Sequence, residues 1–245
     1  MKYIFSIITA VMLSFTNIVT AQNDQPVLAG GPPLYNIDLS RWKLTLPTCP
    51  MYEVYPPSLT NQQWTLPGIF DRGVNGEIIL TTPTAGCTTA NSSYPRTEFR
   101  GMLSTWNDRT NWTFNGTHIL NGTCVINKLP SSKKIIIAQI HGKTGTLDPY
   151  FKMYHKKGKI VGEIDGDNYE FGKFDLNKPI SYSVIVKDFT IEVVVNGKTS
   201  KVIKIDENYA DCTFYFKAGL YCIDNSKDDD WARVTYYALE QIHQF

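Results

Sequence analysis

Three short segments of the chain carry polar side chains at alternate positions, and these side chains have acid–base or anion-binding chemistry. The segments read RTEFR over 96–100, QIH over 139–141 and YFKAGLY over 215–221. Successive side chains of a β-strand point to opposite faces, so each segment would gather its polar residues on one face. The candidate site residues are Arg96, Glu98, Arg100, Gln139, His141, Tyr215, Lys217 and Tyr221. Their guanidinium, amide, imidazole and phenol groups predict a site that binds an anion and moves a proton.

The elements that must position these residues are strands. The intervening apolar residues would face a core, and they are Phe99, Ile140, Phe216, Ala218 and Leu220. About a dozen strand-like runs and no long helical period predict an all-β sandwich or barrel. The runs are 42–46, 77–82, 96–102, 118–127, 134–141, 150–155, 159–164, 169–174, 182–187, 190–195, 201–205, 213–222 and 232–239.

Turn and loop signals separate these runs. Asn196 and Gly197 follow an apolar run and predict a tight hairpin turn, and 166–168 predict another. The proline-rich segment 47–70 predicts a long surface excursion. The acidic run 224–230 predicts a solvated loop.

The first 21 residues have the pattern of a secretory signal peptide. Lys2 supplies the positive charge, an apolar run follows, and small residues precede Gln22. Polar residues interrupt the apolar run, which is shorter than the roughly 20 residues of a membrane span. We therefore predict a cleaved signal over 1–21, a single domain over 22–245, secretion to the extracellular space and no membrane association.

Charge and cysteine content narrow the possible partners. Removing Lys2 from the 24 basic residues leaves 23, which equals the 23 acidic residues. A nucleic-acid-binding domain usually has a basic excess, so no nucleic-acid partner is expected, and a polyanion would be attracted only by a local groove. No CxxC pair and no cysteine–histidine cluster at zinc spacing occurs in the sequence, so we expect neither metal nor other cofactor.

Export makes disulfides and glycans plausible. Five cysteines follow the signal, and we predict a bond between Cys49 and Cys87, each in a loop after a strand. Cys212 and Cys222 lie along one strand at a separation that exceeds the reach of a disulfide. N-glycosylation sequons begin at Asn91, Asn111, Asn115 and Asn121, and a glycan at Asn91 would border the site.

The three polar segments resemble the signature strands of the alginate lyases of polysaccharide lyase family 7. YPRTEFR over 94–100, QIH and YFKAGLY occur in the family's order, and DLSRWKLTLP over 38–47 is similar to its first strand. The resemblance implies a jelly-roll β-sandwich of two antiparallel sheets with a concave groove, in which a monomeric enzyme cleaves alginate by β-elimination.

The resemblance also implies roles for individual residues. Arg96 and Gln139 would neutralise the uronate carboxylate, His141 would remove the C5 proton, and Tyr221 would protonate the leaving oxygen. On mannuronate, Tyr221 would serve as both base and acid. Arg100 and Lys217 would hold neighbouring uronates beside Tyr215, and Glu98 would orient both arginines.

Three positions of the chain can be compared with that family. Isoleucine at the position of Ile140 accompanies acceptance of guluronate-containing blocks in that family, so the resemblance implies a preference for such blocks, and we expect endolytic cleavage. Ile223 stands where the family often has glutamine, which removes one polar contact. Phe99 replaces a leucine and faces the core, where a change of shape is tolerated if neighbours repack.

Two other functions remain open from the sequence. Glu163, Asp165 and Asp167 echo the acidic motif of laminarinase-like glycoside hydrolases on a similar jelly roll, which need two carboxyl groups about 5 Å apart. A non-catalytic lectin-like module could use the same groove but would need no matched base and acid. The pairing of His141 with Tyr221 favours the lyase.

Overall fold

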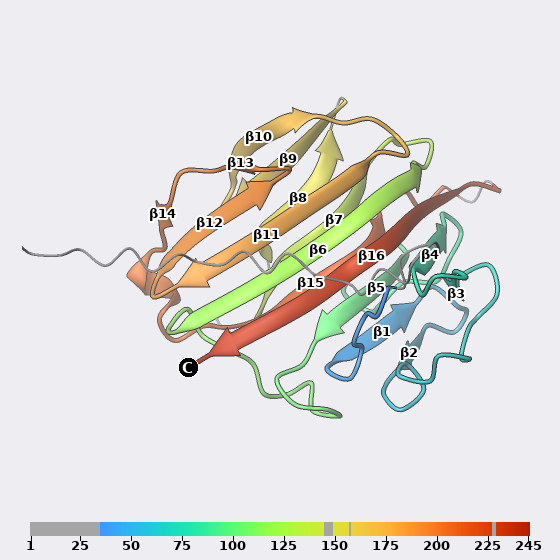
Figure 1. The fold of residues 1–245 in the computed structure, drawn as a ribbon, viewed down its shortest axis with the longest axis horizontal. Helices are drawn as coiled ribbons and strands as arrows, with labels where there is room; N and C mark the ends of the chain where they lie inside the picture. The colour runs from blue at the N-terminus through green and yellow to red at the C-terminus, as the bar shows by residue number, and fades with distance from the viewer. Residues whose placement is uncertain (1–34, 145–148, 157, 227–228) are drawn as a thin grey trace, which may run out of the picture. The chain divides into compact units, whose positions relative to one another are not determined.

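Two antiparallel β-sheets pack face to face in the part of the chain that the structure describes (Figure 1). This computed structural model describes residues 35–144, 149–156, 158–226 and 229–245, so the signal peptide predicted over 1–21 lies outside it. Besides the strands, the described residues contain one short 3₁₀ turn, η1 (Glu207–Tyr209). None of their helices is long and apolar enough to cross a membrane. The predicted all-β jelly-roll sandwich is confirmed.

The sheet that carries the three polar segments is called the site sheet. Its strand order is β10 (Asp167–Lys173), β9 (Lys159–Ile164), β8 (Pro149–Lys156), β7 (Ile135–Thr144), β15 (Thr213–Cys222), β5 (Arg96–Gly101), β1 (Trp42–Leu46) and β2 (Tyr52–Val54).

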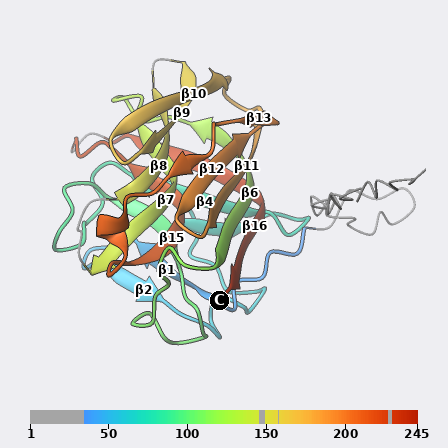
Figure 2. The same cartoon turned by 90° about the vertical axis from the view of Figure 1, so that its left-hand side faces the viewer.

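The second sheet is called the back sheet. Its strand order is β13 (Lys198–Thr199), β12 (Thr190–Val195), β11 (Pro179–Lys187), β6 (Thr117–Lys128), β16 (Trp231–Gln244), β4 (Ile78–Pro83) and β3 (Phe70–Arg72), with β14 (Ile203–Lys204) paired to β12. Figure 2 shows the two layers from the side.

The core lies between the sheets and is built from the alternate apolar residues of each strand. Phe99, Ile140 and Phe216 are fully buried there, as the alternation predicts, and so are Ala218 and Leu220. Burying a large apolar side chain stabilises the fold by about 1.5–3 kcal/mol. This packing fixes the register, because a slip of one residue would turn every polar side chain of the site into the core.

Strand order brings the three polar segments together. β15 lies between β7 and β5 and pairs antiparallel with both. Tyr221 lies opposite Arg96, Lys217 lies opposite both Arg100 and Gln139, and a shift in register follows Ala218. The convergence of the three faces, which only the family resemblance implied, is confirmed.

One predicted turn is confirmed, and two other segments differ from the sequence prediction in detail. Asn196 and Gly197 have φ values of 49° and 75° and join β12 to β13, as predicted. The turn predicted at 166–168 lies one residue earlier, because Asp165 and Gly166 have the positive φ values and β10 begins at Asp167. The segment 47–70 also contains a strand that was not predicted, β2, whose three residues are too few to show alternation.

The loops are fixed by covalent and polar contacts. The predicted bond between Cys49 and Cys87 is present, whereas Cys124, Cys212 and Cys222 are buried thiols. The acidic run does not form a wholly solvated loop: Asp224 accepts a hydrogen bond from the Ser132 amide at 2.9 Å, and Asp230 accepts one from the Ser131 amide at 2.7 Å. Both carboxylates hold the loop before β7, which sequence alone could not place beside them.

Candidate active site

The carboxylate of Glu98 is the centre of the polar cluster on the outer face of the site sheet. It is 1% exposed and accepts hydrogen bonds from Arg96 Nη1 at 3.0 Å and from Gln139 Nε2 at 2.5 Å. It also forms an ion pair with Lys217. Because these partners come from β5, β7 and β15, one buried carboxylate joins all three signature strands.

The charges of this cluster do not cancel. Two cations, Arg96 and Lys217, surround the single carboxylate of Glu98. Burial by itself would raise the pKa of Glu98, but the charges of Lys217 and Arg96 outweigh it and hold the pKa below its usual range. Burial lowers the pKa of Lys217 to about 8, against the opposing charge of Glu98. At neutral pH the cluster is therefore positive and suits one further anion.

Gly219 leaves a gap in the row of side chains on β15, between Lys217 and Tyr221. It pairs with Glu98 across the strands and has a φ of 138°, which favours glycine. A Cβ atom here would lie 2.9 Å from both the Glu98 Cα and the Thr97 carbonyl oxygen. The site therefore has no side chain between Lys217 and Tyr221, where one would normally stand on this face.

A buried tyrosine of the back sheet forms hydrogen bonds with the backbone at Gly219. The hydroxyl of Tyr236 accepts a hydrogen bond from the Gly219 amide at 3.0 Å and donates one to the Ile137 carbonyl at 2.7 Å. It thereby ties β15 to β7 at the point where their register shifts. No motif in the sequence analysis indicated this role for Tyr236.

The hydroxyl of Tyr221 lies in a short chain of hydrogen bonds. Its ring packs under the Arg96 guanidinium, 3.8 Å from ring centre to Cζ, and its oxygen is 3.0 Å from Ser92 Oγ. Ser92 Oγ accepts from Arg96 Nη2 at 2.7 Å and donates to the Tyr94 carbonyl at 3.0 Å. Either oxygen of the Ser92–Tyr221 pair could be the donor in this contact. The Tyr221 hydroxyl thus lies within hydrogen-bonding distance of Ser92 and beside the Arg96 guanidinium.

Ser92 is a site residue that sequence reasoning missed. It lies in the loop before β5 and contacts both Arg96 and Tyr221. Its only signal in the sequence is that it lies four residues before Arg96, inside the sequon that begins at Asn91. Loop residues follow no strand period, so alternation could not assign it to the site face.

His141 lies on the same face, two residues beyond Gln139 on β7. Its ring stacks on Tyr215, with centroids 5.3 Å apart and planes at 17°. Nδ1 lies 2.8 Å from the Gly142 carbonyl oxygen, so Nδ1 carries the hydrogen and Nε2 is the basic nitrogen. Burial lowers the pKa of His141, and the charges of Lys217 and Arg96 lower it further. The imidazole is therefore neutral and basic at neutral pH.

Arg100 belongs to a neighbouring cluster rather than to the one around Glu98. Its guanidinium contacts Asp108 at 3.2 Å and Asn111 Oδ1 at 2.9 Å, and it packs 4.0 Å above the Tyr215 ring. The prediction that Glu98 orients both arginines is therefore wrong for Arg100. The cause is the loop after β5, which brings Asp108 to a position that sequence could not give.

A row of basic and polar side chains crosses the site sheet at the level of Gln139. Strand pairing aligns Lys43 with Arg100, Arg100 with Lys217, Lys217 with Gln139, and Gln139 with Lys152. Nearby carboxylates hold these cations in place, for example Glu163 beside Lys152 at 2.5 Å. Such a row suits an anionic polymer that lies across the strands.

The acidic motif that suggested a glycoside hydrolase does not form a catalytic pair. Glu163 is engaged by Lys152, and Asp165 lies in the turn before β10, where it accepts a hydrogen bond from Tyr209 at 2.7 Å. Neither carboxyl group belongs to the Glu98 cluster. Within the described ranges, no group of three or more His, Cys, Asp or Glu side chains is arranged to hold a metal ion.

Comparison with known proteins agrees with this geometry. A family model described as alginate lyase matches residues 37–243. A substituted form of the family 7 alginate lyase A1-II′ in complex with a product (GGG) is 33% identical, with a TM-score of 0.79 over 85% of this chain and 97% of that chain. A substituted form of A1-II′ in complex with a substrate (GGMG) is 32% identical, with a TM-score of 0.79 over 87% of this chain and 98% of that chain.

A further solved structure is the alginate lyase PA1167 from Pseudomonas aeruginosa. It is 28% identical, with a TM-score of 0.75 over 84% of this chain and 100% of that chain. No curated protein sequence matches the chain. Since the family model covers nearly all described residues and the similar structures share the fold over most of their length, the chain belongs to the alginate lyases of polysaccharide lyase family 7.

Proposed function

We propose that this enzyme cleaves alginate by β-elimination, with Arg96 and Gln139 on the uronate carboxylate, His141 as base and Tyr221 as acid. The observation that carries the proposal is the Glu98 cluster. It supplies surplus positive charge on the same strands that present a neutral imidazole and a phenol hydroxyl. A lectin would need the charge but not the matched base and acid.

The reaction places a clear demand on this charge. The proton to be removed from C5 lies next to a carboxylate, and its loss adds negative charge to a group that is already anionic. Preorganised donors lower this cost by stabilising the developing charge. Arg96 can grip a carboxylate through two hydrogen bonds, and the Gln139 amide can donate another. Glu98 holds both donors in position before substrate binds.

His141 and Tyr221 then carry out the two proton transfers of the reaction. His141 Nε2 takes the C5 proton, electrons form the C4=C5 double bond, and the glycosidic oxygen leaves from C4. Tyr221 donates its proton to that oxygen, and the Arg96 guanidinium over its ring stabilises the phenolate left behind. For mannuronate, where the C5 proton and the leaving oxygen lie on one side of the ring, we propose that Tyr221 first releases its phenolic proton to solvent. The phenolate, stabilised by Arg96, then takes the C5 proton and returns it to the leaving oxygen.

For the substrate, we propose endolytic cleavage with a preference for guluronate-containing blocks. Ile140 is fully buried and can act only by supporting Gln139 and His141 from behind. The oligosaccharides GGG and GGMG in the A1-II′ structures support the preference. Sizing the first products from polyguluronate and polymannuronate tests it. We expect faster cleavage of polyguluronate and an early ladder of mixed lengths; release of only the shortest products from the outset would show exolytic action.

The dependence of kcat/KM on pH should report His141. Its lowered pKa means that the base stays neutral until the pH falls below about 6.5, the ordinary histidine value. We therefore expect the acidic limb to lie below pH 6.5. Above pH about 8, Lys217 loses its proton and the cluster loses attraction for the substrate carboxylate, so KM should rise. Initial rates of ultraviolet absorbance by the new double bond measure both limbs.

A His141 variant distinguishes the contribution of His141 to the pH profile from that of Lys217. The residual activity of His141→Ala should lack the acidic limb and keep the alkaline one. An acidic limb unchanged in that variant would assign it to another group.

We further propose that the enzyme is secreted as a monomer after removal of residues 1–21 and acts without added metal or cofactor. A glycan at Asn91 would stand next to Ser92, which contacts Arg96 and Tyr221. The amide of Asn111 is already engaged by the Arg109 carbonyl at 2.9 Å, so Asn91 is the better candidate for modification beside the site.

A further inference from the structure

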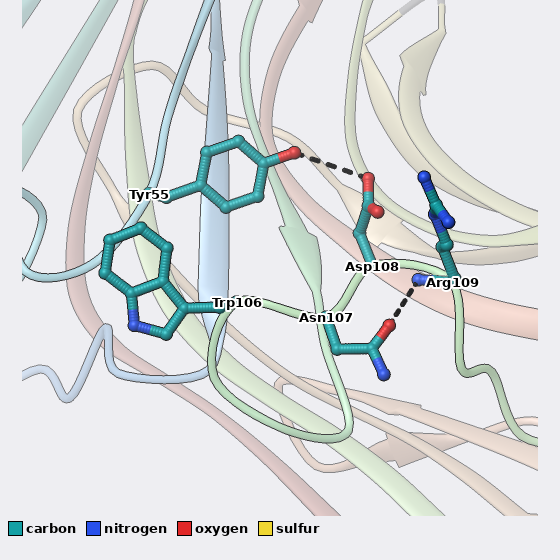
Figure 3. A pocket seen from close by; sticks show the side chains of 5 residues that line it. All are labelled: Tyr55, Trp106, Asn107, Asp108 and Arg109. Carbon is teal, nitrogen blue, oxygen red and sulfur yellow. Dashed lines mark hydrogen bonds between the residues drawn. The ribbon is translucent and has the colours of Figure 1, made fainter.

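An exposed tryptophan stands at the β1–β2 edge of the site sheet, beyond Arg100. Trp106 is 61% exposed and lies parallel to the ring of Tyr55, with centroids 6.3 Å apart and planes at 1° (Figure 3). These two residues and Asn107, Asp108 and Arg109 line a cavity of about 380 Å³. That volume falls in the range of small-ligand sites.

Asp108 connects this cavity to the row of cations that crosses the sheet. Its carboxylate contacts Lys43 at 2.7 Å and Arg100 at 3.2 Å, and the Tyr55 hydroxyl lies 3.4 Å from it. Glu53 contacts Lys43 from the other side at 2.8 Å. Two cations thus neutralise the two carboxylates, so Asp108 at the mouth of the cavity does not repel an anionic ligand.

The loop that carries Trp106 is held in one conformation. Trp106 has a φ of 71°, which is uncommon for a residue other than glycine and often marks a functional position. Asn107 Oδ1 accepts from the Arg109 amide at 2.9 Å, and Thr105 Oγ1 donates to the Ser40 carbonyl at 3.0 Å. The indole is therefore presented to solvent by a fixed turn.

We propose that Trp106, Tyr55 and Arg109 form a distal subsite for one uronate residue of the alginate chain. The inference rests on the proposed function and extends it along the substrate. The apolar face of the pyranose ring packs on the exposed indole, and its carboxylate binds Arg109. Arg109 is exposed, and its guanidinium forms no ion pair with any residue in the described ranges.

The place of this subsite on the sheet decides which substrates use it. Lys43, which contacts Asp108, lies two strands away from Lys217, and two strand spacings are about 10 Å. A sugar on Trp106 is therefore not the sugar whose carboxylate lies at the Glu98 cluster. Long substrates reach both places, whereas the shortest cleavable oligomers reach only the cluster.

Trp106→Ala, with Trp106→Phe beside it, tests the subsite. For Trp106→Ala we expect KM for polymeric alginate to rise about tenfold, with kcat/KM on the shortest cleaved oligomer unchanged. Trp106→Phe should keep most of the affinity because it keeps a ring. Arg109→Ala should raise KM for the polymer by a smaller factor, and high salt should abolish that difference because the contact is exposed.

Tyr52→Ala is the matched control. Tyr52 is 63% exposed on β2, but the alternation of that strand turns it away from Glu53 and the cavity. The Tyr52→Ala substitution should leave KM unchanged for every substrate. An unchanged KM of Trp106→Ala on the polymer would overturn the subsite, and so would an equal loss on short and long substrates. Neither result would contradict the proposed β-elimination. Variants of His141 and Tyr221, assayed on short oligomers, test that reaction separately.

Discussion

Replacing Tyr221 with phenylalanine is expected to lower kcat for alginate cleavage by about a thousandfold, the middle of the range for loss of a general acid. The variant keeps the ring that packs under Arg96 at 3.8 Å and removes only the hydroxyl that contacts Ser92 Oγ. Substrate binding should survive, because in the proposed mechanism Arg96 and Gln139 hold the substrate carboxylate. The measurements are the rate of double-bond formation and, separately, the binding of an alginate oligomer to the variant.

Tyr94→Phe provides the control for this result. The Tyr94 ring lies edge-on to Tyr221, with centroids 6.2 Å apart, and Tyr94 takes part in the hydrogen-bond chain through Ser92 with its backbone amide and carbonyl. Its side-chain hydroxyl should therefore be dispensable. A Tyr221→Phe enzyme that kept kcat within a few fold of the wild type on every alginate block would show that another group protonates the leaving oxygen.

The faces of the signature strands could be predicted from sequence because alternation is a local property. Phe99 and Ile140 had to turn inward if the chain was to bury a core, so Glu98 and Gln139 had to turn outward. The meeting of these residues was not a local property. It depends on the pairing of β15 with both β5 and β7, which only the family resemblance implied.

Loop residues at the site could not be predicted in the same way. Ser92, Asp108 and Trp106 lie in segments that have no period, and each contributes through a contact that depends on the fold. Asp108 also explains why Arg100 is not a partner of Glu98. An arginine on the site face has several carboxylates within reach, and alternation gives its face but not its partner.

Replacing Glu98 with alanine should destabilise the protein by about 3–5 kcal/mol, because it leaves buried charge without a partner. Arg96 and Lys217 both contact this carboxylate, and Lys217 is only 7% exposed. The free energy of unfolding, measured by urea denaturation at neutral pH, gives the loss. The same variant should lose most activity, since Arg96 and Gln139 lose the group that positions them.

The dependence of this destabilisation on pH distinguishes lost charge compensation from lost packing. In the wild type, the pKa of Glu98 is held below its usual range, so its contribution is complete above about pH 4.3 and disappears as the pH falls through the folded-state value. In Glu98→Ala, Lys217 can escape its uncompensated charge by releasing a proton, which becomes easier at higher pH. The loss relative to the wild type should therefore be smaller at pH 9 than at pH 7. Adding Lys217→Met to Glu98→Ala should restore part of the stability at pH 7, whereas a loss that is the same at both pH values and is not relieved by Lys217→Met would mean that packing, not charge, makes Glu98 necessary.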